Sequence, residues 1–167
     1  MTIKTDFQVV DSKMITNIVL KKHGHKAELD LDAIFDPGST MTTMSETLFN
    51  RIGYPLQESG NVKIIGVNSE SKGFSTLIDF MKIGGVNLGR IRIVVGQLHP
   101  KFANNIIIGM NILLWYDIAI SHYNKTITLV ERKFKGFDMS SRFIMHNIMN
   151  LNLASYEIGG TLNKGLG

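Results

Sequence analysis

Short apolar segments of strand length, separated by glycines and polar turns, run along most of this chain. In residues 27–33 apolar side chains alternate with charged ones, as in a strand that is buried on one face. Residues 15–35 are therefore expected to form two strands around a turn at Gly24, and residues 88–98 another strand. The pattern predicts a small β domain, closed or partly closed, with two brief helices.

The remaining segments follow the same scheme. Residues 62–85 are expected to form a hairpin with the polar tip "NSESKG". Residues 104–132 are expected to give a buried strand, a glycine, one helical turn and a hairpin around "HYNK". A short helix is predicted over "SETLFNRIG", because Ser45 can cap its first turn and Gly53 can end it.

The chain is expected to divide into three parts. Residues 1–14 are polar and irregular, which indicates an N-terminal tail or an edge strand. Residues 15–132 hold the strand pattern and are expected to form the folded domain. Residues 133–167 form a C-terminal extension, in which four apolar residues have helical spacing: Phe143, Ile144, Ile148 and Leu151. We expect these residues to pack on another surface, either a contact between two copies or a cleft of the domain, and the alternative is a disordered tail.

Composition narrows the classes of function. The 167 residues suffice for one domain with a sizeable core. No apolar run is long enough for a membrane helix, and the N-terminus does not resemble a signal peptide, so a cytoplasmic location is expected. The absence of cysteine excludes disulfides, thiol nucleophiles and zinc–thiolate sites. The net charge of +4 comes from scattered Lys and Arg residues, which indicates a solvated surface.

The stretch "AIFDPGST", residues 33–40, ends an apolar strand with a carboxylate. A carboxylate at the end of a buried strand is costly unless it is hydrogen-bonded or paired. The Gly38 N–H and the Ser39 hydroxyl are close enough in sequence to bond to Asp36. Asp36 is therefore either a functional carboxylate or an ordinary aspartate that opens a loop, and this short motif alone does not separate the two.

Four segments in order resemble those of retropepsin-like aspartic proteases, the single-domain, retroviral-type members of that class. "AIFDPGST" is similar to their active-site stretch, and "IIGVNSESKGF", residues 64–74, stands where their flap hairpin is found. "IIIGMNILLWYDIAI", whose glycine follows Asp36 by 73 residues (109 − 36), resembles their second motif. "YNKTITL", residues 123–129, resembles their closing hairpin. The resemblance covers roughly residues 15–132.

The resemblance implies an all-β fold with short helices, a closed barrel-type domain that forms a symmetric homodimer. It implies an aspartic endopeptidase with one Asp36 from each subunit, because a single-motif chain builds a pair of carboxylates only by two-fold symmetry. The positions carried over are Asp36 as the catalytic residue, Pro37, Gly38, Ser39 and Thr40 as the active-site loop, Ile65, Gly66, Val67 and Asn68 in the flap, and Ile108 and Gly109 in the second motif. The expected partners are a second copy and a peptide or protein substrate, without nucleic acid, membrane, metal or cofactor.

Position 37 departs from the family pattern. Thr or Ser normally stands there, and its hydroxyl and N–H form hydrogen bonds that lock the two active-site loops across the dimer. Pro37 has neither donor. An alternative is therefore a catalytically weak relative that binds peptides or only dimerises. A second alternative, a small β-barrel that binds nucleic acid, is disfavoured because the sequence lacks a basic–aromatic pattern.

Three further polar residues have simpler interpretations. His23 and His25 flank Gly24 and have no acidic or histidine partner nearby in the sequence, so a hairpin turn is favoured over a metal site. Asn111 follows Gly109 and Met110, at a position where many relatives of the resembled family carry Asp. We interpret Asn111 as a helix cap.

Overall fold

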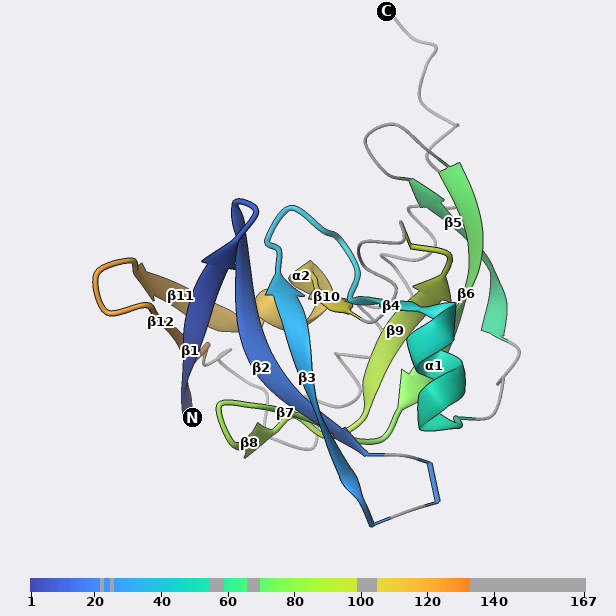
Figure 1. Ribbon diagram of the computed structural model, residues 1–167, viewed down its shortest axis with the longest axis horizontal. Coiled ribbons are helices and arrows are strands. Elements are labelled where there is room, and N and C mark those ends of the chain that lie inside the picture. The colour runs from blue at the N-terminus through green and yellow to red at the C-terminus, as the bar shows by residue number, and fades with distance from the viewer. Residues whose placement is uncertain (22, 25, 55–58, 66–69, 99–104, 133–167) are drawn as a thin grey trace, which may run out of the picture.

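A computed structural model describes residues 1–21, 23–24, 26–54, 59–65, 70–98 and 105–132 of the chain (Figure 1). These residues form a mostly β structure with two short helices, α1 (Glu46–Ile52) and α2 (Met110–Leu113). The strands are β1 (Thr2–Val10), β2 (Lys13–Lys21), β3 (Glu28–Phe35), β4 (Thr43–Ser45), β5 (Ser59–Ile65), β6 (Glu70–Ile78), β7 (Met81–Ile83), β8 (Val86–Asn87), β9 (Ile91–Gly96), β10 (Ile106–Ile108), β11 (Tyr116–Ser121) and β12 (Thr126–Glu131). The all-β class with short helices is therefore confirmed.

The expectation of a closed barrel is wrong. The strands form one path in the order β11-β12-β1-β2-β3-β10-β4-β9-β6-β5, with β7 paired to β2 and β8. Within the described residues the two end strands, β11 and β5, do not pair with each other, and Figure 1 shows them on opposite sides of the molecule. Closure depends on strand tilt and stagger across the whole sheet, which alternation within single strands does not specify.

Strand β1 is an interior strand, which corrects the expectation of a tail or an edge strand at residues 1–14. Its first half, from Thr2 to Asp6, pairs with β12, and its second half, from Phe7 to Val10, pairs with β2. Ile3 and Phe7 are buried, whereas Lys4 is exposed. These few inward side chains let a mostly polar segment join the sheet.

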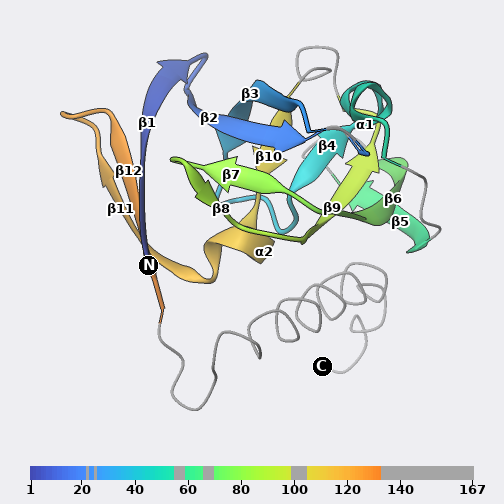
Figure 2. The ribbon, with the colours of Figure 1, turned by 90° about the horizontal axis from the view of Figure 1, so that it is seen from below.

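The core lies between the curved parts of this sheet and is built from aliphatic and aromatic side chains of nearly every strand. Helix α1 covers one part of it, beside β4 and β9 (Figure 2). The predicted helix signals are confirmed: the Ser45 side chain accepts a hydrogen bond from the Leu48 N–H, and Gly53 ends the helix with φ 71°. Leu48, Phe49 and Ile52 are buried on its inner face.

The predicted hairpins are present. Strands β2 and β3 pair around a turn that contains Gly24, and β11 pairs with β12 around residues 122–125. Strands β5 and β6 pair antiparallel, with Ile65 opposite Glu70. The expected tip, residues 68–73, is wrong in its second part, because residues 70–73 belong to β6, and residues 66–69 lie outside the described residues. No helix in the described part of the chain is long and apolar enough to cross a membrane.

Candidate active site

Two strand pairings determine where Asp36 lies. Strand β3 runs parallel to β10, with Phe35 opposite Ile108, and β10 in turn pairs antiparallel with β4. Asp36 is the first residue after β3, and its N–H donates to the Ile108 carbonyl at 3.1 Å. The loop that follows, residues 36–42, leaves β3 on one side of β10 and enters β4 on the other. Asp36 is thereby held at the centre of the sheet.

The loop begins with a hydrogen-bonded β-turn. The Ser39 N–H donates to the Asp36 carbonyl at 3.1 Å, so Pro37 and Gly38 are the two central residues. The second position of such a turn favours proline, because its ring sets the φ angle that the turn requires. Pro37 is exposed and needs no donor for this turn. The local backbone therefore accommodates the residue that departs from the family pattern.

The Asp36 carboxylate folds back onto its own turn. The Gly38 N–H donates to Asp36 Oδ1 at 2.9 Å, as the motif predicts. A Cβ at Gly38 would lie 3.1 Å from the same oxygen, so a side chain there would crowd the carboxylate. The expected bond from the Ser39 hydroxyl is wrong, because this hydroxyl donates to the Met41 carbonyl at 2.9 Å. Only the backbone of Ser39 contacts Asp36, and Thr40 is exposed.

The segment "IIIGMN" packs directly against the loop. Ile108 is fully buried, and the Met110 N–H donates to the Ser39 carbonyl at 2.8 Å. A Cβ at Gly109 would lie 2.5 Å from the Met41 carbonyl carbon and 2.9 Å from the Ser39 carbonyl oxygen. Only glycine lets the two backbones approach this closely. The structure therefore brings both residues of the predicted second motif to the Asp36 loop.

The side chain of Asn111 is the buried polar link between loop and helix. Its Oδ1 accepts hydrogen bonds from the Thr42 N–H at 2.6 Å and from the Thr42 hydroxyl at 2.8 Å. Its Nδ2 donates to the Arg92 carbonyl at 2.9 Å. The interpretation of Asn111 as a helix cap is wrong, because Gly109 is the N-cap of α2. The sequence feature that could have indicated this buried role is the single amide residue within the apolar run "GMNILLW".

The predicted flap is only partly described. Ile65 is the last residue of β5, and Gly66, Val67 and Asn68 lie outside the described residues. Below the tip, Val62 forms a small buried cluster with Met41 and Val94, against which Ile64 packs. The hairpin β5–β6, the active-site loop and β9 therefore share one apolar contact.

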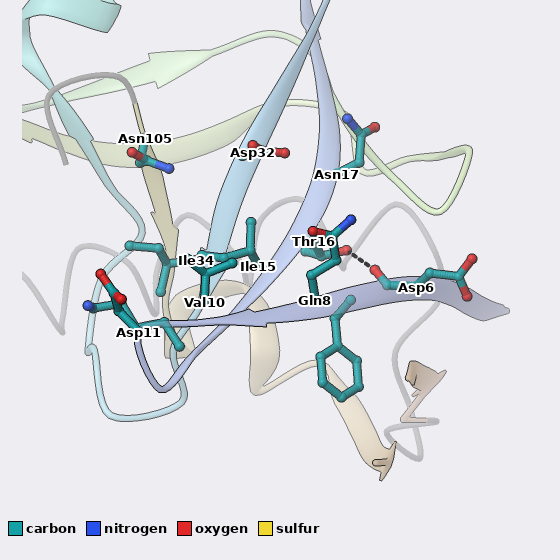
Figure 3. Close-up of a pocket in the computed structure, with 12 residues that line it drawn as sticks. Asp6, Gln8, Val10, Asp11, Ile15, Thr16, Asn17, Asp32, Ile34 and Asn105 are labelled. Atoms are coloured by element: carbon teal, nitrogen blue, oxygen red, sulfur yellow. Dashed lines mark hydrogen bonds between the residues drawn. The ribbon is translucent and has the colours of Figure 1, made fainter. Parts of the chain in front are cut away.

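A cavity of about 460 Å³ lies beside β3, and Asp36 is not among the residues that line it (Figure 3). The β1–β2 hairpin and β3 form most of its wall, and Ile34, two residues before Asp36, is part of the lining. Three carboxylate residues also line it: Asp6, Asp11 and Asp32. Among the residues that the structure describes, no three His, Asp or Glu side chains come together to hold a metal ion.

Comparison with known proteins identifies the family. The family model described as aspartyl protease matches residues 24–112, more than half of the chain. A search of curated proteins gave no match. The chain belongs to the aspartyl protease family, and its fold is that of the retropepsin-like members.

The structure is similar to that of a retropepsin-like aspartic protease from Rickettsia conorii. The two share 16% sequence identity with a TM-score of 0.56, over 77% of this chain and 89% of the other. EIAV protease in complex with an inhibitor matches with a TM-score of 0.46 and 19% identity, over 64% of this chain and 90% of the other. The retroviral protease-like domain of Ddi1 from Leishmania major matches with a TM-score of 0.49 and 12% identity, over 75% of this chain and 98% of the other.

Proposed function

We propose that this protein is an aspartic endopeptidase whose catalytic dyad contains Asp36 from each of two identical subunits. The observation that carries the proposal is the Asp36 carboxylate, held at 2.9 Å by the Gly38 N–H at the end of β3. The sequence contains one Asp-x-Gly motif, so a second carboxylate of the same kind must come from another copy. Membership of the aspartyl protease family supports the same reaction.

The chemistry needs two carboxylates that share one proton, because two like charges in contact cannot both be ionised. The ionised Asp36 acts as the general base for a water molecule held between the two subunits. The protonated Asp36 donates a hydrogen bond to the scissile carbonyl and then passes its proton to the leaving amine. The Gly38 N–H keeps one oxygen of each carboxylate in place, which leaves the other free for water and substrate.

The substrate is an extended peptide that lies between the Asp36 loop and the β5–β6 hairpin, with residues 64–74 closing over it as the flap. Backbone pairing with extended segments gives affinity, and side-chain pockets give preference. The buried cluster of Met41, Val62 and Val94 holds the loop and the hairpin together beside this space. Residues 15–132 form the catalytic domain in this proposal, and no cofactor takes part.

A second function is favoured by Pro37. Because Pro37 has no N–H and no hydroxyl, it cannot form the cross-subunit bonds that Thr or Ser makes in the family. A protein with this loop can retain the cleft as a peptide-binding or dimerisation module with little catalytic power. The two functions differ in pepstatin-sensitive cleavage of a peptide library, which only the peptidase shows.

The test of the peptidase is Asp36→Asn. We expect cleavage of a peptide library to fall at least about 100-fold, because the proton transfer is lost, while the dimer persists. Asp30→Asn is the matched control, since Asp30 is an exposed carboxylate on β3, the strand that Asp36 follows. Cleavage that stays near the wild-type rate in pure Asp36→Asn protein would rule out the aspartic mechanism.

A further inference from the structure

Arg92 lies half-buried on β9, and the described residues supply one hydrogen-bond partner for its guanidinium. Its Nη1 donates to the Ser75 hydroxyl at 2.9 Å, and its Nε is buried without a hydrogen-bond partner. No carboxylate from the described part of the chain contacts this guanidinium. Burial lowers the pKa of Arg92 from its ordinary value, the direction expected for a cation without a nearby negative charge.

Arg90, two residues before Arg92, shows the usual arrangement of an arginine, which is an exposed side chain paired with a carboxylate. Arg90 is half exposed, and its Nε donates to Asp79 Oδ1 at 2.8 Å. Water therefore stabilises the charge of Arg90 in addition to its ion pair. Arg92 has lost more water and has no such pair, which is costly for a charged group. A half-buried cation with an unpartnered N–H is a candidate to bind a ligand that carries a negative charge.

The position of Arg92 connects it to the proposed cleft. Alternate side chains of a strand point to the same face, so Arg92 shares a face of β9 with Val94. Val94 packs against Met41 of the active-site loop and Val62 of the β5–β6 hairpin. The Arg92 carbonyl accepts the hydrogen bond from Asn111, which also holds the loop at Thr42. Arg92 therefore flanks the contact between loop and hairpin.

We propose that Arg92 binds a carboxylate of the peptide substrate, and so makes this protein selective for acidic peptides. This proposal rests on the proposed peptidase function and names its substrate class. The carboxylate comes from an Asp or Glu side chain or from the C-terminus of the peptide. A carboxylate matches the guanidinium, because its two oxygens can accept from two N–H groups that Ser75 leaves free.

The first experiment compares cleavage of paired peptides. Each pair carries Glu or Gln at one position, and each peptide is made with a free and an amidated C-terminus. We expect the wild type to cleave the carboxylate member with a roughly 10- to 100-fold higher kcat/KM. If replacing Glu by Gln in the peptide removes the preference, the bound carboxylate belongs to a side chain. If amidation removes it, the bound carboxylate is the C-terminus of the peptide.

Three variants test whether Arg92 causes the preference for peptides that carry the carboxylate. Arg92→Gln should abolish it, Arg92→Lys should retain part of it, and Arg90→Gln should leave it intact. Arg90→Gln is the matched control, because it removes the same charge two residues away. A wild type that cleaves Glu and Gln peptides equally well, at every position and with either terminus, would overturn the proposal but not the peptidase.

The second experiment does not need cleavage or a variant that folds. In the full-length wild type, the NMR signal of the Arg92 Nε–H is followed while three pools of valine-rich hexapeptides are added. One pool carries a single Glu and blocked ends, the second has Gln instead, and the third has Gln and a free C-terminus. We expect a saturable shift with a carboxylate pool and none with the blocked Gln pool. The absence of any shift, or equal shifts with all pools, would overturn the carboxylate site, and a shift in a protein that cleaves nothing would overturn only the peptidase.

Discussion

Single residues around Asp36 determine how the active-site loop is held. The hydrogen bonds of Asn111 join Thr42, which is 69 residues away in sequence, to helix α2 and to β9. Asn111 is 2% exposed and Thr42 is fully buried, so water cannot replace these bonds if the amide is removed. The loop position therefore depends on one amide that is distant from Asp36 in sequence.

Asn111→Ala should lower the free energy of unfolding by about 3–5 kcal/mol, because it leaves the Thr42 N–H, the Thr42 hydroxyl and the Arg92 carbonyl without their partner. Urea unfolding monitored by tryptophan fluorescence measures this change. Asn124→Ala is the control, because Asn124 is an exposed turn residue and its replacement should change stability by less than about 0.5 kcal/mol. Equal stabilities of the two variants would contradict the role of Asn111.

At the scale of elements, the Asp36 turn shows how one segment serves two requirements. The turn needs a residue at position 37 that favours its φ angle, and proline does this while Ser39 closes the turn. The proposed dimer needs donors at the same position, and proline has none. Folding of the subunit and locking of the dimer therefore favour different residues here.

Pro37→Thr should restore both donors and lower the dimer dissociation constant by about two to four orders of magnitude, from four bonds of about 1 kcal/mol each. The rate of peptide cleavage at low protein concentration should rise, because more of the protein is then dimeric. The free energy of unfolding of the isolated subunit should fall by about 0.4–1 kcal/mol, because threonine leaves the unfolded chain more conformational freedom than proline.

Pro37→Ala is the matched variant for this prediction, because it restores the N–H without the hydroxyl. Its dimer should therefore be intermediate in affinity. Analytical ultracentrifugation and peptide cleavage measure the two effects. If Pro37→Thr changes neither the dissociation constant nor the cleavage rate, the missing donors are not what limits this loop.

For the whole molecule, the last described residues, around the end of β12, are held by the sheet and by β11. Strand β12 pairs with both β1 and β11, and the Arg132 N–H donates to the Trp115 carbonyl at 2.9 Å. Arg132 also forms an ion pair with Asp117 at 2.8 Å. Strand β12 is thus held by strands on both sides within the described residues. We propose that the extension, residues 133–167, acts on the dimer or the cleft, on the evidence of its apolar spacing.

A chain that ends after Arg132 should keep the thermal midpoint of the subunit within a few degrees, because the pairing of β12 is intact. Its dimer affinity or its cleavage rate should change, since the apolar residues of the extension no longer contribute. Sedimentation and cleavage of the same peptide library measure both quantities. Unchanged values of both would indicate that the extension plays no part in either.

The sequence by itself determined the features that depend on near neighbours. The alternation in residues 27–33 predicted β3, and Ser45 and Gly53 predicted both ends of α1. The bond from the Gly38 N–H to Asp36 was also predicted, because only two residues separate the partners. In each case the deciding contact forms within one turn or one strand, so composition and spacing suffice.

Only the tertiary structure decided which distant segments lie together. The open sheet, the interior place of β1 and the bond from Thr42 to Asn111 all depend on strand neighbours far apart in sequence. The same holds for Arg92, because the described surroundings that leave its Nε buried without a partner come from segments distant in sequence. Periodicity shows that a strand has a buried face, but the strand that covers this face is selected by packing of the whole sheet.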